Sequence, residues 1–337
     1  MDKGDKVTPS HIFRFKDVPG SSSGGCHALV WLPQDNDVTG KKLPVAIMIH
    51  GGGFTMEAAD DIPFNNVNYY LENGFIVVSL EYRLQPHVIL SDIRQDILDG
   101  YLFVQSELAQ ELQKAGSQVN VDGEKTNVQG WSAGGTATVF LSHDIQEYNK
   151  TASKPAPLPK ANIVTYPMTR PHLHHNEPRS ALEEYAKGLT EEERTTLNAI
   201  YDEPISTGHA HEDWTPDSKT PRMKWLMSVL MSGCINSFLI GQDPPYPASG
   251  SCINAINADT PPTCVVVATA DELLGTVDSY ALADDLKALG VESPVYVAEG
   301  MPHGIAEHHS KTWPEGVKWW DEAILPSLQW AVAKTLS

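Results

Sequence analysis

The pentapeptide at 130–134, GWSAG, has the form G-x-S-x-G, with one serine between two glycines. An apolar stretch precedes it and small residues follow it, which predicts a tight turn from a strand into a helix. Such a turn projects the serine hydroxyl above the sheet, and the flanking glycines allow the close backbone approach that the turn demands. We therefore predict that Ser132 is a catalytic nucleophile.

A run of glycines, HGGGF at 50–54, ends an earlier apolar stretch. Consecutive glycines let backbone N–H groups turn toward a developing oxyanion, and the residue after a nucleophilic serine supplies a further N–H. We predict an oxyanion hole made by Gly52, Gly53 and Ala133. A flexible glycine turn after a strand is the alternative, and the serine motif that follows in the expected order favours the oxyanion hole.

A nucleophilic serine needs a general base, and the base needs an acid that orients it. Asp271 closes the apolar stretch CVVVATA, and His303 follows in the sequence GMPHGI. We predict a triad of Ser132, Asp271 and His303, in the chain order Ser, Asp, His that the G-x-S-x-G hydrolases use. Glu272 is the competing acid, because it is the next residue along the chain.

The elements that must position these residues alternate along the chain. Apolar stretches that do not alternate with polar residues are typical of parallel strands covered on both faces. They are VAIMIHGGG (45–53), FIVVSLEYR (75–83), TNVQGWSAGG (126–135), CVVVATAD (264–271) and PVYVAEG (294–300). Helices are predicted over 91–113, after Ser132, over 276–289 and over 319–335. Together they predict an α/β fold with a mostly parallel, doubly wound sheet, and the early strands 11–18 and 26–33 form an antiparallel edge.

This alternation stops between the second and third of these helices. The segment 169–261 holds two candidate helices, 190–203 with a capping box at its start and 222–240. We predict that it is a mainly helical cap inserted into a core of 1–168 and 262–337. A cap at this point of the chain lies over the carboxyl ends of the strands.

Four motifs in register carry a resemblance to a known family. HGGGF, EYRLQP (81–86), GWSAGG, and the pair DEL (271–273) with HG (303–304) resemble the hormone-sensitive-lipase branch of the α/β hydrolases. The resemblance covers 28–150 and 262–335, and it implies the α/β-hydrolase fold, esterase activity, and the triad and oxyanion donors named above. The sequence departs from the family in three ways: Trp131 replaces a usual acidic residue, Glu272 replaces a common proline, and the N-terminal arm is short and polar.

The substrate pocket is predicted less directly than the triad. The residues assigned to it are Phe54 and Trp131, beside the two motifs, and Met223, Met227 and Met231, which recur every four residues on the cap helix. Methionine adapts to irregular apolar shapes, so these side chains suit an acyl or polycyclic substrate. Ordinary packing of the cap on the core is the alternative for some of the methionines.

Composition and charge restrict the partners and the compartment. The 337 residues are 41% apolar with a formal net charge of −19, which predicts a globular protein that nucleic acid and anionic membranes repel. The N-terminus has no signal-peptide pattern, and the uncharged stretch 225–242 carries too many polar residues for a membrane span, so a cytoplasmic protein is expected. The composition leaves a homodimer open.

The cysteines and histidines give no clear metal signal. We predict that the four scattered cysteines are buried thiols. The histidine-rich segments 172–175 and 208–211 are predicted to be solvated loops rather than a metal site. The predicted chemistry requires no metal and no organic cofactor.

The leading functional hypothesis is a serine hydrolase that cleaves carboxylic esters of small, largely apolar molecules through an acyl-enzyme. The alternative is a non-hydrolytic enzyme of the same fold, running acyl transfer, lactone chemistry or condensation, because the long cap and Trp131 could exclude water. The sequence also resembles fungal proteins associated with secondary metabolism. A non-catalytic ligand receptor is a third hypothesis, against which the presence of His303 argues.

Overall fold

A single mixed sheet forms the centre of the molecule. The computed structural model describes residues 7–33, 41–170, 175–206, 219–306 and 314–337. Within them the strands are β1 (His11–Asp17), β2 (Gly25–Trp31), β3 (Lys42–Ile49), β4 (Ile76–Leu80), β5 (Asn120–Trp131), β6 (Ala161–Thr165), β7 (Thr263–Ala268) and β8 (Val295–Ala298). Their order across the sheet is β1-β2-β4-β3-β5-β6-β7-β8. The six strands from β4 to β8 run parallel, and β2 pairs antiparallel with both β1 and β4. This confirms the predicted fold class and the antiparallel edge.

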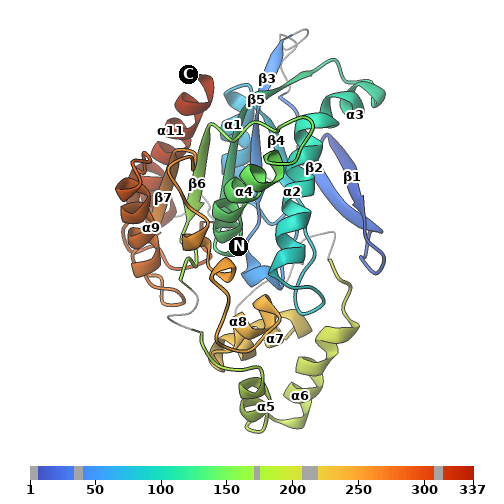
Figure 1. The fold of residues 1–337 in the computed structure, drawn as a ribbon, viewed down its shortest axis with the longest axis vertical. Coiled ribbons are helices and arrows are strands. Elements are labelled where there is room, and N and C mark those ends of the chain that lie inside the picture. Colours follow the sequence, from blue (N-terminus) through green and yellow to red (C-terminus); the bar gives the residue numbers. More distant parts are fainter. Residues whose placement is uncertain (1–6, 34–40, 171–174, 207–218, 307–313) are drawn as a thin grey trace.

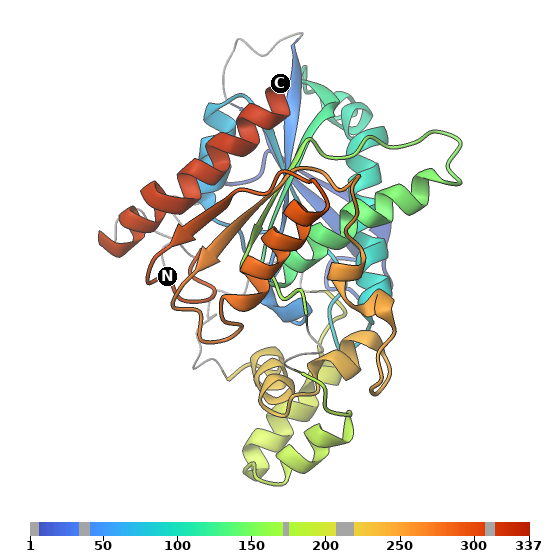
Figure 2. The same cartoon turned by 60° about the vertical axis from the view of Figure 1, so that its left-hand side comes forward.

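Helices cover both faces of this sheet. They are α1 (Phe64–Glu72), α2 (Leu90–Ser106), α3 (Leu108–Lys114), α4 (Ala133–Asn149), α5 (Ser180–Ala186), α6 (Glu191–Asn198), α7 (Pro221–Met231), α8 (Ile235–Ile240), α9 (Val277–Ala288), α10 (Pro314–Trp319) and α11 (Leu325–Leu336). Helices α1 and α11 lie on one face, and α2, α4 and α9 lie on the other (Figures 1 and 2).

Two apolar cores result, one on each face. In β3, Val45 and Ile47 point into the core beneath α2, α4 and α9, while Ala46 and Met48 point into the core beneath α1 and α11. Successive side chains of a strand face opposite ways, so a strand covered on both faces must be apolar throughout. This explains why the sequence shows unbroken apolar stretches rather than alternation.

The helices α5 to α8 lie between β6 and β7 in the chain and pack into a separate apolar cluster beyond the carboxyl ends of the strands (Figure 1). The segment 169–261 is therefore mainly helical, as expected, and the domain boundaries themselves stay a prediction. The prediction of a single helix over 222–240 is wrong. It is two helices, α7 and α8, because Gly233 takes a left-handed conformation with φ of 72° and ends the first of them.

Two further helices are interrupted where periodicity alone predicted continuity. The segment 91–113 is divided into α2 and α3 at Glu107, whose backbone leaves the helical region. The C-terminal helix begins at α10 and continues through a π-helical turn, Trp320–Ile324, into α11. One face of α2, with Ile93, Ile97 and Tyr101, is buried.

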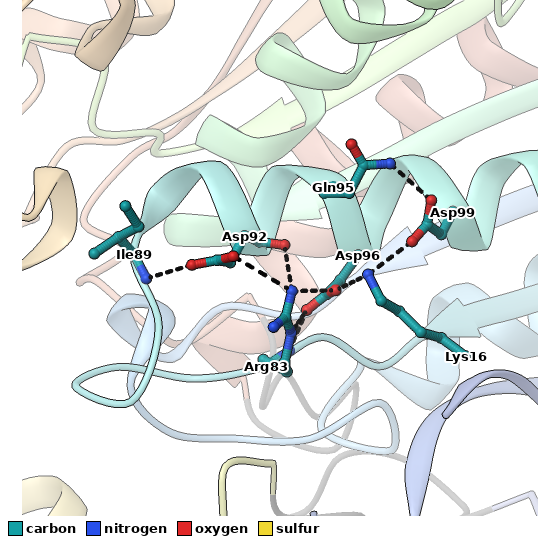
Figure 3. Close-up of polar contacts among 7 residues, drawn as sticks. All are labelled: Lys16, Arg83, Ile89, Asp92, Gln95, Asp96 and Asp99. Atoms are coloured by element: carbon teal, nitrogen blue, oxygen red, sulfur yellow. Dashed lines mark hydrogen bonds and ion pairs between the residues drawn. The ribbon is translucent and has the colours of Figure 1, made fainter. Parts of the chain in front are cut away.

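The loop that follows β4 is fastened to α2 by a buried ionic cluster (Figure 3). Arg83 donates to both carboxylate oxygens of Asp96, at 2.7 and 2.9 Å, and Lys16 of β1 lies 2.6 Å from the same carboxylate and 2.7 Å from that of Asp99. The side chain of Asp96 is fully buried, so its two cationic partners are what makes its burial tolerable. The cluster fixes the backbone of the motif EYRLQP near the glycine loop.

Several expectations concern membranes and metals. In the part of the chain that the structure describes, no helix is both long enough and apolar enough to cross a membrane. The histidine-rich segments fall largely outside the described residues, which do not include His172, His174, His209 or His211. Among the described residues, no group of three or more His, Cys, Asp or Glu side chains is placed to hold a metal ion.

Candidate active site

Ser132 stands on a sharp turn between β5 and α4. Its backbone has φ of 50° and ψ of −119°, a conformation that non-glycine residues rarely adopt. The neighbouring glycines make the turn possible. A Cβ at Gly130 would lie 2.1 Å from the carbonyl oxygen of Gly134, and a Cβ at Gly134 would lie 2.1 Å from that of Ile49. Both positions of the motif therefore require glycine for reasons of space.

The structure brings the three predicted triad residues together from three separate loops. The Nε2 atom of His303 lies 2.9 Å from the Oγ of Ser132, and its Nδ1 lies 2.7 Å from Oδ2 of Asp271. Asp271 follows β7 and His303 follows β8, so the parallel strands place both at the same edge of the sheet as the end of β5. The arrangement is that of a nucleophile, a base and an orienting acid.

Asp271 is held as a carboxylate. Burial by itself would raise the pKa of Asp271, but the hydrogen bond and charge of His303, with N–H donors from Leu274 and Leu273, outweigh it and lower that pKa. The two N–H groups lie 2.8 and 2.9 Å from Oδ1, so the carboxylate is oriented by its own loop. The competing acid, Glu272, lines the cavity next to this site and has no hydrogen bond to His303 among the described contacts.

We expect Asp271→Asn to lower kcat on esters by about 10⁴-fold, because an amide cannot hold the imidazole in the tautomer that accepts the serine proton. The matched variant Glu272→Gln should keep kcat within about threefold, since it changes a neighbouring carboxylate that does not orient the base. Steady-state kinetics on both purified variants measure this. A larger loss in the Glu272 variant would reverse the assignment of the acid.

The predicted oxyanion donors occupy the first turns of two helices. Gly52–Phe54 forms a short 3-10 helix in which Gly52 and Gly53 have φ of 77° and 61°, and Ala133 is the first residue of α4. The first N–H groups of a helix have no partner within it, so all three can turn to a substrate oxygen. The Tyr82 hydroxyl lies 2.9 Å from the carbonyl oxygens of both His50 and Gly51 and steadies this loop.

A cavity of about 660 Å³ opens beside Ser132 and His303. Its lining is mainly apolar and comes from the glycine loop, the cap helices and the loops after β6, β7 and β8. Of the residues predicted for the pocket, Phe54, Met223 and Met227 line it. The lining residues that sequence reasoning missed include Met56, Glu57, Met168, Leu226, Leu230, Ile235, Leu273 and Leu274. For Leu226 and Leu230, the helical spacing from Met223 was a usable signal.

Two residues predicted to line the pocket do not line this cavity, and those assignments are wrong. Trp131 is 1% exposed and packs in the core beneath α1 and α11, because the strand alternation of β5 points its side chain away from the cavity. Met231 is 67% exposed. It lies two four-residue steps beyond Met223, and each step rotates a side chain by about 40° around the helix, so Met231 faces solvent.

We expect Met227→Ala to enlarge the cavity and to raise the ratio of kcat/KM for an octanoyl ester to that for a butanoyl ester by about fivefold, since each further buried methylene is worth about 0.8 kcal/mol. Met231→Ala, one turn along the same helix, should leave that ratio within about twofold. The two profiles are compared with p-nitrophenyl esters. Equal shifts in both variants would show that Met227 is not a wall of the acyl site.

Comparisons with known proteins support the fold. Residues 46–307 match a family model described as the alpha/beta hydrolase fold. Among solved structures, carboxyl esterase 2 from the fungus Tuber melanosporum superposes with a TM-score of 0.58 at 19% identity, covering 99% of this chain and 89% of that one. An esterase from Pyrobaculum calidifontis has a TM-score of 0.58 at 20% identity, covering 97% and 85%. At such identities these likenesses show the fold.

The chain matches only a small part of each of its curated relatives. The non-reducing polyketide synthase ausA of Aspergillus calidoustus is 26% identical over 310 residues, which are 81% of this chain and 12% of that protein. The 5-methylorsellinic acid synthase of Aspergillus terreus is 26% identical over 327 residues, 86% of this chain and 12% of that protein. The chain thus spans about an eighth of the length of these relatives. On the family match and the fold, the chain belongs to the α/β hydrolases, in the hormone-sensitive-lipase-like branch that its motifs resemble.

Proposed function

We propose that this protein hydrolyses carboxylic esters of small, largely apolar molecules through an acyl-enzyme on Ser132. The observation that carries the proposal is the chain of two hydrogen bonds, Ser132 to His303 and His303 to Asp271, at the wall of an apolar cavity. An apolar cavity with few polar groups that converge on one point is the form of a small-molecule site.

The first half of the reaction transfers the acyl group to the protein. The Oγ of Ser132 attacks the ester carbonyl carbon while Nε2 of His303 takes the serine proton, and Asp271 stabilises the imidazolium that forms. The carbonyl oxygen becomes an oxyanion facing the N–H groups of Gly52, Gly53 and Ala133. The tetrahedral intermediate then expels the alcohol, which leaves with the proton from His303.

The second half repeats these steps with water in place of the serine. Water adds to the acyl carbonyl as His303 accepts its proton, and the C–O bond to Ser132 breaks as His303 returns the proton to Oγ. The product is a carboxylic acid, and the free enzyme is regenerated. The steps use side chains and backbone N–H groups of this chain alone.

Acyl transfer is the second candidate, and one observation favours it. The curated relatives are synthases by their names, one of them a polyketide synthase, and a segment of each is similar to this chain. If an alcohol, amine or carbon nucleophile enters the cavity in place of water, the same acyl-enzyme gives transfer, lactone chemistry or condensation. The assembled Ser132–His303 pair supports either reaction over a non-catalytic receptor.

The test is release of p-nitrophenol from esters with acyl chains of 2 to about 12 carbons, with and without an added alcohol such as methanol. Hydrolysis predicts that the free acid is the main product both without alcohol and with about 1% methanol by volume. Acyl transfer predicts that the new ester dominates. A folded protein that turns over none of these esters would refute the proposed general esterase.

The proposal extends to the partners of the protein. The net charge of −19 favours a neutral or cationic small molecule over nucleic acid or an anionic membrane. A homodimer and a cytoplasmic location remain proposals of the same kind.

A further inference from the structure

Arg222 is a buried cation at the start of α7, in the cap. Its side chain is 3% exposed, and it donates hydrogen bonds to backbone carbonyls from separate parts of the chain. Nη1 donates to the oxygen of Thr55 at 2.6 Å, with that of Gln85 further away at 3.5 Å, and Nη2 donates to the oxygen of Pro204. These carbonyls belong to the glycine loop, the loop after β4, and the cap.

The environment of Arg222 is unusual for a guanidinium group. Burial lowers the pKa of Arg222 to about 10, and Glu203 acts against this. The carboxylate of Glu203 is 3.8 Å from Nε, too far for a hydrogen bond. At neutral pH the group is still charged. Carbonyl oxygens rather than a close carboxylate accept the hydrogen bonds of its two terminal nitrogens, and the buried Nε has no hydrogen-bond partner among the described residues. Burying a charge in this way is costly unless its hydrogen bonds are well made.

The three segments that Arg222 joins are also connected to one another. The N–H of Gln85 donates to the carbonyl oxygen of Phe54 at 2.8 Å, and the N–H of Leu84 donates to that of Ile205 at 2.8 Å. The preceding residue, Arg83, is fixed to Asp96 of α2 (Figure 3). The loop after β4 is therefore hydrogen-bonded to the core, to the glycine loop and to the cap. Arg222 adds a direct hydrogen bond between the cap and the glycine loop.

Helix α7 contacts the glycine loop a second time, one turn further along. A Cβ at Gly53 would lie 2.6 Å from Cδ1 of Leu226, so the Leu226 side chain rests directly on that residue. Arg222 and Leu226 are four residues apart and share one face of the helix. The same helix provides Met223 and Met227 to the cavity wall. One helix thus contacts both the acyl site and the oxyanion donors.

We propose that Arg222 is a positioning residue, which holds the oxyanion loop in register with the cap helix that lines the acyl site. The proposal rests on the proposed function, because it assigns a purpose to the N–H groups of Gly52 and Gly53. Thr55 accepts the Arg222 hydrogen bond, and its own N–H donates to Gly52 at 2.9 Å. Releasing Thr55 frees the turn that aims these donors, and misplacement by about 1 Å can cost about 10²-fold in rate.

The planar fork of arginine is what this junction needs. Its two terminal nitrogens reach carbonyls of different segments at the same time, whereas the ammonium of lysine is a single point of charge on a flexible stem. Arg222→Lys keeps the charge and loses the fork, while Arg222→Met loses both and keeps most of the apolar stem. Lys224→Met is the matched control, because Lys224 sits on α7 and pairs with Glu193 inside the cap.

The experiment measures the reaction of Ser132 with an alkyl fluorophosphonate, followed by mass spectrometry of the intact protein. The Oγ of Ser132 bonds to phosphorus, fluoride leaves with the electron pair of the P–F bond, and the serine proton passes to His303. The phosphoryl oxygen occupies the oxyanion hole, so the limiting rate kinact reports on that hole while the constant KI reports on binding. Thermal unfolding of each variant confirms that it is folded.

We expect Arg222→Met to lower kinact about 100-fold with KI within about threefold, Arg222→Lys to lower it about tenfold, and Lys224→Met to change neither constant. If the Arg222 substitutions only loosened the packing of the cap, they would raise KI, and the Lys224 variant would show the same effect. An unchanged kinact in folded Arg222→Met, or equal losses in it and the control, overturns the proposal. If Arg222→Met does not fold, the Arg222→Lys result decides by the same criteria.

This readout separates the proposal from the function on which it rests. A wild type that is labelled on Ser132 but turns over no ester refutes the proposed esterase and still tests Arg222 through kinact. A wild type whose Ser132 is not labelled at all overturns both proposals, because Ser132 would then not be a nucleophile and the oxyanion donors would have no reaction to assist.

Discussion

Ser132→Ala is expected to lower kcat on p-nitrophenyl esters by about 10⁶-fold while leaving KM within about threefold. The variant keeps the cavity and the oxyanion donors, so binding persists, but no oxygen is present to form the acyl-enzyme. The unusual backbone at this turn has φ of 50°, and alanine has the same Cβ as serine, so the free energy of unfolding should change by less than about 1 kcal/mol.

A double variant makes this prediction specific to a triad. Because Ser132 and His303 lie 2.9 Å apart and act as a unit, His303→Ala should cost nearly as much as Ser132→Ala, and the double variant should lose little more than either. Initial rates at saturating ester, corrected for the uncatalysed reaction, provide the comparison. Losses that multiply would mean that the two residues act independently, and the acyl-enzyme mechanism would have to be abandoned.

Gly134→Ala is expected to prevent normal folding, or to lower the free energy of unfolding by about 4 kcal/mol or more. The added Cβ would lie 2.1 Å from the carbonyl oxygen of Ile49 and 2.4 Å from that of His50. Both are backbone atoms at the end of β3, so no flexible side chain can move aside. Separating α4 from β3 would also displace Ser132 from the oxyanion donors.

The next residue provides the control for this effect. A Cβ at Gly135 would meet its nearest neighbours at 3.3 Å, a tight contact that shifts of a few tenths of an ångström relieve. Alanine also favours a helix over glycine by about 0.5–1 kcal/mol, so Gly135→Ala should change the free energy of unfolding by less than about 1.5 kcal/mol. Denaturant unfolding of both variants tests the contrast. Equal stabilities would show that the close approach of α4 to β3 does not account for the glycine at 134.

The chemistry-bearing residues could be located from the sequence because they follow local rules. Ser132, Asp271 and His303 each come just after an apolar stretch, and the carboxyl ends of parallel strands meet at one edge of a sheet. The structure accordingly places the three side chains within hydrogen-bonding distance. The glycines of the two motifs were equally readable, since close backbone contacts and positive φ angles leave few alternatives to glycine.

The wall of the cavity could not be read in the same way. Methionines at spacing four suggested one lining face, yet Met231 faces solvent while Leu226 and Leu230 line the cavity. The helix expected over 222–240 is broken at Gly233, and Trp131 packs into the core beneath α1 and α11 instead of lining the cavity. Periodicity gives the face of a helix or strand, but not the partner that this face meets.

The α/β core, the order of the motifs and the positions of the triad residues could therefore be predicted from the sequence, because each depends on the chain within a few residues of it. The shape of the acyl cavity and the junction at Arg222 could not be predicted before the structure was known. These depend on how the cap docks, and the carbonyls of Thr55, Gln85 and Pro204 are separated from Arg222 along the chain by 167, 137 and 18 residues. Contacts at such separations leave no periodic pattern in a sequence, since they arise from packing between elements rather than from the conformation of any one of them.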